Sequence, residues 1–198
     1  CAAAVSFALS MRRRHPDYTG REPWNFILAV LFGDDELKIL DYNRVVRDLN
    51  GMTDRQLLAR IAACFEIDFT GEEVARPRCK GEFGMYVKDG WYLLTVREEY
   101  KSPDPVDGLD TALLQKYVLE PVFGIRDPRR DERISFVGGL RGPAELEAKV
   151  NRDGGAAFLL YPTSLKELFA VADAGRLMPP KSTWFEPKLR SGLLIYSL

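Results

Sequence analysis

The chain has 198 residues, with 28 Lys plus Arg against 29 Asp plus Glu and a formal charge of −1. Its apolar fraction of 46% is ordinary for a globular protein and excludes a disordered chain, a collagen-like repeat and a coiled coil. The near-zero charge argues against nonspecific nucleic-acid binding as the main activity.

The apolar runs and the few cysteine and histidine residues exclude further kinds of protein and site. The longest unbroken apolar run, Phe26 to Phe32, is far shorter than the ~20 residues that a membrane helix needs. Three cysteines (Cys1, Cys64, Cys79) and a single His15 are too few for a disulfide framework or a zinc site. We therefore expect a reduced, cytoplasmic protein that neither spans a membrane nor holds a metal.

The first third of the chain predicts a helix, a hairpin and a second helix. Residues 1–14 are rich in Ala and end in three arginines, which suits a helix C-terminus. By composition residues 25–32 are a buried strand, and 37–40 are expected to return as the second strand of a hairpin. Thr53 is the expected N-cap of a helix, and residues 65–69 alternate like a strand.

The middle of the chain contains the clearest hairpin signal. Residues 70–81 are polar and predict a loop. Two apolar runs, 83–87 and 91–96, then flank an Asp-Gly pair that favours a tight turn. Residues 109–119 predict a helix that stops before a proline.

The last third predicts short strands mixed with helices. Strands are expected at 134–137, 156–160 and 193–196. Helices are expected at 143–150, with proline at its first position, and from the cap at Ser164 to a glycine at 175. Because strands and helices mix without strict alternation, the expected fold class is α+β (mixed α/β), with a mixed sheet, hairpins and packed helices in one region, 1–198.

Two segments resemble phosphate-binding loops imperfectly. Residues 175–182 nearly match a Walker A loop, but Pro180 replaces its second glycine and has no N–H to donate to a phosphate. Residues 137–142 lie between a strand and a helix, but Val137 stands where the dinucleotide fingerprint begins with glycine. An ordinary tight turn is the better interpretation of the second segment.

The C-terminal arm, residues 179–192, is expected to be extended because its prolines stiffen it. It combines cations and hydroxyls that bind phosphate or carboxylate through charge-assisted hydrogen bonds. Its candidate ligands are Lys181, Ser182, Thr183, Lys188 and Arg190. A purely structural arm laid across the fold, with solvated cations, is the alternative that composition leaves open.

The same arm carries a resemblance to a known family. Residues 178–193, Met-Pro-Pro-Lys-Ser-Thr-Trp-Phe-Glu-Pro-Lys-Leu-Arg-Ser-Gly-Leu, resemble the closing signature of the uncharacterised family called domain of unknown function 1015. The segments 40–46, 109–125, 158–163 and 172–175 resemble further parts of that family.

The resemblance implies a longer protein with a phosphate site. Family members are about twice this length, and a motif Ala-Asp-Gly-His-His-Arg is expected directly before Cys1. That motif is similar to one in the partition-protein (ParB) and sulfiredoxin-like fold and in free-serine kinases, where it meets nucleotide phosphate. By this analogy residues 1–14 form the helix behind the phosphate site. Where the family has Pro-Thr-His-Arg, this chain has Asp41-Tyr42-Asn43-Arg44, so Arg44 is expected to position an anion.

Three functional hypotheses follow. The first is an enzyme or enzyme half that binds a nucleotide or phosphorylated small molecule, and when full length is a small-molecule kinase-like phosphotransferase using a nucleotide with Mg²⁺. The second is a partition-protein-like nucleic-acid-binding or regulatory protein, which the near-zero charge disfavours. The third is a noncatalytic structural half. Under the first hypothesis, Arg44 and the cations of the arm converge on one anion pocket beside the opening helix.

Overall fold

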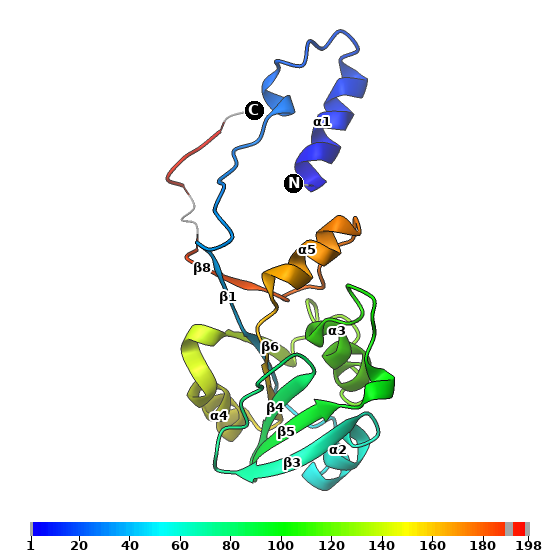
Figure 1. Ribbon diagram of the computed structural model, residues 1–198, viewed down its shortest axis with the longest axis vertical. Coiled ribbons are helices and arrows are strands. Elements are labelled where there is room, and N and C mark those ends of the chain that lie inside the picture. Colours follow the sequence, from blue (N-terminus) through cyan, green and yellow to red (C-terminus); the bar gives the residue numbers. More distant parts are fainter. Residues whose placement is uncertain (1, 189–191, 197–198) are drawn as a thin grey trace. The chain divides into compact units, whose positions relative to one another are not determined.

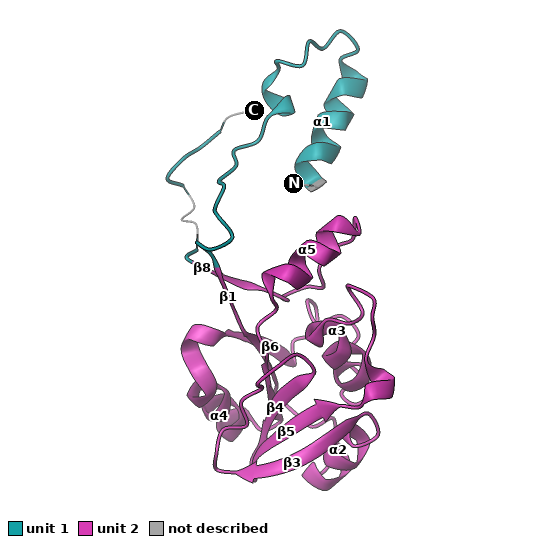
Figure 2. Ribbon diagram, viewed as in Figure 1, with its two compact units in different colours: residues 1–37, 187–198 teal, residues 38–186 magenta. Residues whose placement is uncertain are grey.

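A computed structural model describes residues 2–188 and 192–196 of the chain. The chain forms two compact units, shown in different colours in Figure 2. The larger unit comprises residues 38–186, and the smaller comprises residues 1–37 with 187–198. Each unit is described by itself below.

The larger unit is built on a six-stranded sheet in the order β3-β5-β4-β7-β2-β6. Strands β3, β5 and β4 of this sheet lie side by side in Figure 1. Every pair of neighbouring strands is antiparallel. The expected α+β class is therefore confirmed. The strands are β2 (Tyr42–Val46), β3 (Phe65–Gly71), β4 (Glu82–Val87), β5 (Gly90–Val96), β6 (Ile134–Gly138) and β7 (Ala156–Leu160).

Helices cover both faces of this sheet. Buried side chains of α2 and α3 pack against one face, and those of α4 pack against the other. Each helix buries its apolar stripe against the alternating residues of the strands that face it. The core therefore consists of two apolar clusters, one on each face of the sheet. The helical elements are α2 (Asp54–Ile61), η2 (Glu98–Tyr100), α3 (Asp110–Leu114), η3 (Gln115–Leu119), η4 (Gly139–Arg141), α4 (Gly142–Asp153) and α5 (Leu165–Asp173).

Most local predictions for this unit are confirmed. The β4–β5 hairpin turns at Gly90, whose positive φ of 137° suits glycine. Thr53 and Ser164 begin α2 and α5, each with a capping box in which side chain and backbone satisfy each other's free donors. The helix predicted at 109–119 is present, but its second half, η3, is a π-helical turn.

The hairpin predicted from residues 25–32 and 37–40 is wrong. The second segment does form β1 (Lys38–Leu40), but β1 pairs with β8 (Trp184–Glu186) from the C-terminal arm in a separate two-stranded sheet. Gly138 permits this docking, because a Cβ there would lie only 2.6 Å from the Trp184 ring. The pairing depends on a distant segment and on a glycine without a side chain, neither of which a local pattern displays.

The smaller unit contains α1 (Ala2–Arg14) and the short η1 (Pro23–Asn25). The helix expected at the N-terminus is confirmed over its described residues. Residues 26–32 form no strand, and Leu31 is 93% exposed, so the apolar composition there does not reflect a buried strand. The strand expected at 193–196 is also absent, and Ile195 is 85% exposed. Both segments lack the ladder partner that an extended chain needs to count as a strand.

Of the helices in the described part of the chain, none combines the length and apolar character that crossing a bilayer requires.

Candidate functional site

A cleft of about 480 Å³ lies in the larger unit, between α3, η3, the loop that follows them, β2 and the start of the C-terminal arm. This volume is typical of small-molecule sites. Its lining contains four cations, Arg44, Lys116, Arg126 and Arg129, and two carboxylates, Glu120 and Asp127. The cleft is therefore electropositive.

Arg44 provides the buried charge of this cleft. It lies on β2, opposite Phe136 of β6 and Phe158 of β7, and only 3% of its surface is exposed. Because side chains alternate along a strand, Arg44 shares a face with Val46, which packs in the cluster that contains α2 and α3. The strand alternation thus directs an arginine to the side of the sheet where α3 lies.

The guanidinium of Arg44 has neutral partners only. Nη1 donates to the carbonyl oxygen of Tyr42, and Nη2 donates to that of Lys181 at 3.0 Å. The Cζ atom lies 5.5 Å from the centre of the Phe136 ring, a cation–π contact. Among the described residues no carboxylate pairs with it. Burial lowers the pKa of Arg44 to about 10.

The other side of the cleft comes from α3 and η3. The π-helical turn is marked by a hydrogen bond from the amide of Glu120 to the carbonyl of Gln115, 3.0 Å long. Such turns are frequent at functional sites because they change which side chains share a face. Thr111, Gln115 and Lys116 all line the cleft.

The two remaining unpaired cations sit at the exposed side of the cleft. Lys116 and Arg126 are both exposed, and neither has a carboxylate partner in the described part of the chain. Arg129 differs, because its Nε and Nη2 donate to the two carboxylate oxygens of Asp127, each at 3.0 Å. The pair Arg129–Asp127 is neutral as a unit, so the positive charge of the cleft comes from the other three cations.

The C-terminal arm closes one wall through a chain of hydrogen bonds. Pro179 and Pro180 line the cleft, and Ser182, 5% exposed, lies behind them. The hydroxyl of Ser182 donates to the carbonyl of Pro179 at 2.6 Å and lies 3.2 Å from the hydroxyl of Thr111. Thr163 donates to the Ser182 carbonyl at 3.1 Å. The arm is thereby fixed to α3 and to the loop between β7 and α5.

The residues expected to bind an anion are brought together only in part. Arg44 lines the cleft, and Lys181 lies beside it, with its carbonyl accepting from Arg44 and its Nζ 5.9 Å from the same Phe136 ring. Ser182 is buried in the hydrogen-bond chain, and Thr183 is half-buried just beyond it. Lys188 belongs to the smaller unit, and Arg190 lies outside the described residues.

Sequence reasoning missed several cleft residues. Thr111, Gln115 and Lys116 were recognised only as part of a helix, because nothing local signals a π-helical turn. Arg126 and Arg129 belong to a basic stretch, Arg-Asp-Pro-Arg-Arg-Asp-Glu-Arg, whose charge density was the available signal.

The glycine pair at the end of β6, Gly138 and Gly139, has a packing role in an ordinary turn. A Cβ on Gly138 would meet the Trp184 ring, and one on Gly139 would collide with the carboxylate of Asp41. The amide of Gly139 donates to the carbonyl of Asp41 at 2.9 Å. These contacts explain both glycines without a dinucleotide.

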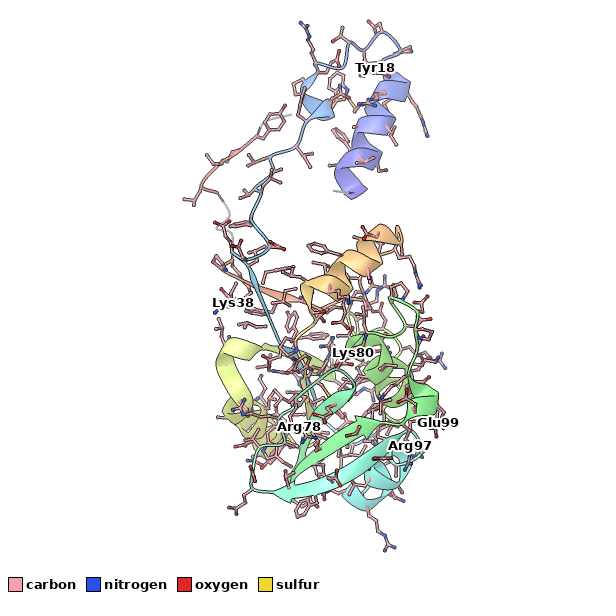
Figure 3. The ribbon with its side chains drawn as sticks, viewed as in Figure 1. Tyr18, Lys38, Arg78, Lys80, Arg97 and Glu99 are labelled. Carbon is pink, nitrogen blue, oxygen red and sulfur yellow. The ribbon has the colours of Figure 1, made fainter. Side chains whose placement is uncertain are left out.

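A buried carboxyl lies next to the cleft wall. Asp110, 8% exposed, accepts a hydrogen bond from the amide of Gly81 at 2.9 Å. Burial raises the pKa of Asp110 to about 7, although the Gly81 amide opposes this shift. Lys80, labelled in Figure 3, forms an ion pair with Glu167 at 2.8 Å. The negative charge of Glu167 raises the pKa of Asp110, and the positive charge of Lys80 lowers it.

Several solved structures are similar to this chain at low identity. Free serine kinase in complex with AMP matches at 16% identity and a TM-score of 0.47, over 80% of this chain and 57% of that one. A mutant of the kinase in complex with ADP matches at 15% identity and a TM-score of 0.47, over 80% and 57%. A conserved hypothetical protein from Pyrococcus furiosus matches at 15% identity and a TM-score of 0.48, over 80% and 60%.

Because these TM-scores are below 0.5, the likeness transfers neither fold nor function to this chain. The chain spans less than two thirds of the length of these structures. No curated protein matches the chain.

The family model described as "Protein of unknown function (DUF1015)" matches residues 1–112, which is more than half of the chain. This match agrees with the resemblance seen in the C-terminal arm, which lies outside the matched residues. The chain belongs to the DUF1015 family.

Proposed function

We propose that the cleft binds a phosphorylated small molecule or a nucleotide, with Arg44 as its principal anion ligand. The observation that carries this proposal is a buried guanidinium, without a carboxylate among the described residues, in the wall of a cleft. Burying an uncompensated charge is costly, and a bound anion offsets that cost. Arginine also matches phosphate geometrically, since its planar fork donates two parallel hydrogen bonds.

The charge balance of the cleft supports an anion with more than one negative charge. Arg44, Lys116 and Arg126 have no carboxylate partner in the described part of the chain, and only Glu120 among the cleft acids lacks a cation. The excess is two positive charges. A phosphate monoester carries up to two negative charges near neutral pH.

The residues predicted from the arm take different parts in this proposal. Lys181 supplies a second cation beside Arg44, and its φ of 59° places it in a conformation that is costly for a side-chain-bearing residue. Ser182 positions Thr111 and does not itself contact the anion. Thr183, Lys188 and Arg190 remain predicted contributors.

A phosphotransfer reaction would belong to the full-length protein. Such a reaction depends mainly on positioning and on stabilising charge, which the cations of this cleft can supply. The catalytic base would come from the part of the family pattern expected before Cys1.

A site that holds Mg²⁺ by protein side chains alone is not found among the described residues. They contain no group of three His, Cys, Asp or Glu side chains placed to hold a metal. Of the two cleft acids, Asp127 is already bound by Arg129 through two hydrogen bonds. No step is therefore assigned to a metal.

Calorimetry tests the proposal directly. The chain is titrated with ATP, ADP, CTP and phosphoserine, and binding of at least one of them is expected. Arg44→Gln abolishes the heat, whereas Arg55→Gln, an exposed arginine on α2, leaves it unchanged. Absence of heat with all four ligands contradicts the proposal.

A structural role for the arm is the second candidate. The burial of Ser182 and its hydrogen bonds to Pro179 and Thr111 favour it. Under this reading Lys181→Ala changes the free energy of unfolding but no ligand affinity. Under the first proposal the same variant weakens binding of the phosphorylated ligand.

A further inference from the structure

A single aromatic ring lies against two cations of the proposed site, Arg44 and Lys181. Phe136 is on β6, the edge strand of the sheet, directly opposite Arg44 on β2. The Cζ atom of Arg44 lies 5.5 Å from the centre of the Phe136 ring, and Nζ of Lys181 lies 5.9 Å from it. Both distances are within the range of the cation–π attraction, in which the electron-rich face of the ring stabilises a positive charge.

A second ring supports the ammonium of Lys181. Its Nζ atom lies 5.7 Å from the centre of the Tyr42 ring, and the Tyr42 and Phe136 rings meet edge to face with their centres 5.7 Å apart. Tyr42 in turn meets Trp184 of β8 edge to face, with ring centres 5.1 Å apart. The three rings therefore form an aromatic row that joins β8, β2 and β6, and Lys181 lies against two of them.

The electron density of the Phe136 ring matters because no carboxylate holds these cations. Neither Arg44 nor Lys181 forms an ion pair with an acid in the part of the chain that the structure describes. Two like charges close to one ring also repel each other. An aliphatic side chain on this edge strand could fill the same space, but only an aromatic ring attracts both charges.

The two cations are also tied through the main chain, since the carbonyl of Lys181 accepts from Nη2 of Arg44 at 3.0 Å. Resting on the function proposed above, we infer that Phe136 is a positioning residue, whose ring holds the Arg44 guanidinium and the Lys181 ammonium in place before the anion binds. A ligand that meets cations already in place does not have to order them, and it binds more tightly for that reason.

Fluorination of Phe136 tests the inference while the ring keeps nearly the same size. Fluorine withdraws electron density from the ring face, so Phe136→difluorophenylalanine and Phe136→pentafluorophenylalanine weaken the cation–π contacts stepwise. Calorimetry with ATP, ADP, CTP and phosphoserine measures the affinity. For whichever ligand binds the unaltered chain, we expect the pentafluoro variant to bind about three- to tenfold more weakly, the range for one side chain ordered on binding, and the difluoro variant to lie between. An unchanged or increased affinity overturns the inference and leaves the anion proposal standing. Binding of none of the four ligands overturns both.

NMR relaxation of the Arg44 Nε–H group separates positioning from a merely structural role. In the ligand-free protein its order parameter should fall in the pentafluoro variant, and a constant value contradicts the inference. Phe65→pentafluorophenylalanine is the matched control, because Phe65 lies in the core with its ring 5.7 Å from that of Phe83, and no described cation lies over it. The control should keep both affinity and order parameter, and an equal loss of affinity there contradicts the inference. If the pentafluoro variant does not fold, as its melting curve will show, the difluoro variant decides.

Discussion

The substitution Arg44→Met separates the binding role of Arg44 from its structural role. In the ligand-free protein, burial lowers the pKa of Arg44 to about 10, which corresponds to a cost of about 3 kcal/mol for holding the charge. The hydrogen bonds to the carbonyls of Tyr42 and Lys181 offset that cost, at roughly 1.5–3 kcal/mol each. Together the two bonds exceed the cost by about 0–3 kcal/mol, so we expect the free energy of unfolding to fall by no more than about 3 kcal/mol.

The effect on ligand binding follows from the contacts with the phosphate. Two charge-assisted hydrogen bonds from one guanidinium to a phosphate contribute about 3 kcal/mol together, which is roughly a 100-fold change in Kd. Calorimetry measures Kd for the tightest-binding nucleotide, and urea unfolding at pH 7.5 measures stability. Arg44 is protonated in both the folded and the unfolded protein at this pH, because even its lowered pKa of about 10 lies well above 7.5. Stability depends on pH through this group only above about pH 10, where it rises with pH. A Kd within threefold of the unaltered protein, with folding intact, refutes the reasoning.

Three further predictions concern stability and are read from urea unfolding. The pKa of Asp110 is raised, so the folded protein binds its proton more tightly than the unfolded chain, and the stability from this group is lost as the pH rises from about 4 to 7. The difference in unfolding free energy between the unaltered protein and Asp110→Asn should therefore fall by up to about 4 kcal/mol over this window, and a constant difference contradicts the prediction. Gly155→Ala should lower the free energy of unfolding by more than about 3 kcal/mol, because both a positive φ and a collision with the Val46 carbonyl oppose a Cβ there. The control Gly175→Ala, at a position with a positive φ and open space, should lower it by about 1–2 kcal/mol. Similar losses of stability in the two variants would show that the collision relaxes. Ser164→Ala should cost about 1 kcal/mol through loss of the α5 cap, and no change would show that the cap does not contribute.

Features set by neighbouring residues were predictable from the sequence. The β4–β5 hairpin follows from two apolar runs around an Asp-Gly pair. The start of α5 follows from Ser164, because a capping box involves residues only three apart. In both cases the stabilising contacts lie within a few residues of each other.

Features set by distant partners were not predictable in this way. The β1–β8 sheet requires two segments from opposite ends of the larger unit to pair, and residues 25–32 looked equally suited to be a partner. Of the anion ligands expected from the sequence, only Arg44, expected through family resemblance, lines the cleft, with Lys181 beside it. Lys116 belongs to a π-helical turn, and the hydrogen bond from Gln115 to the Ile125 carbonyl ties the loop that carries Arg126 to this turn. Patterns of hydropathy and charge in the sequence predict neither the π-helical turn nor the position of the loop that carries Arg126.

Side-chain NMR of Arg44 tests the central claim most directly. The Nε–H resonance of Arg44 can be assigned as the peak that disappears in Arg44→Lys, and the protein is then titrated with ADP and with glycerol 3-phosphate. The account predicts that this resonance shifts saturably with at least one of the two ligands, in parallel with that of Arg126. A saturable binding event that leaves the Arg44 resonance unmoved, or no binding at all, would contradict it.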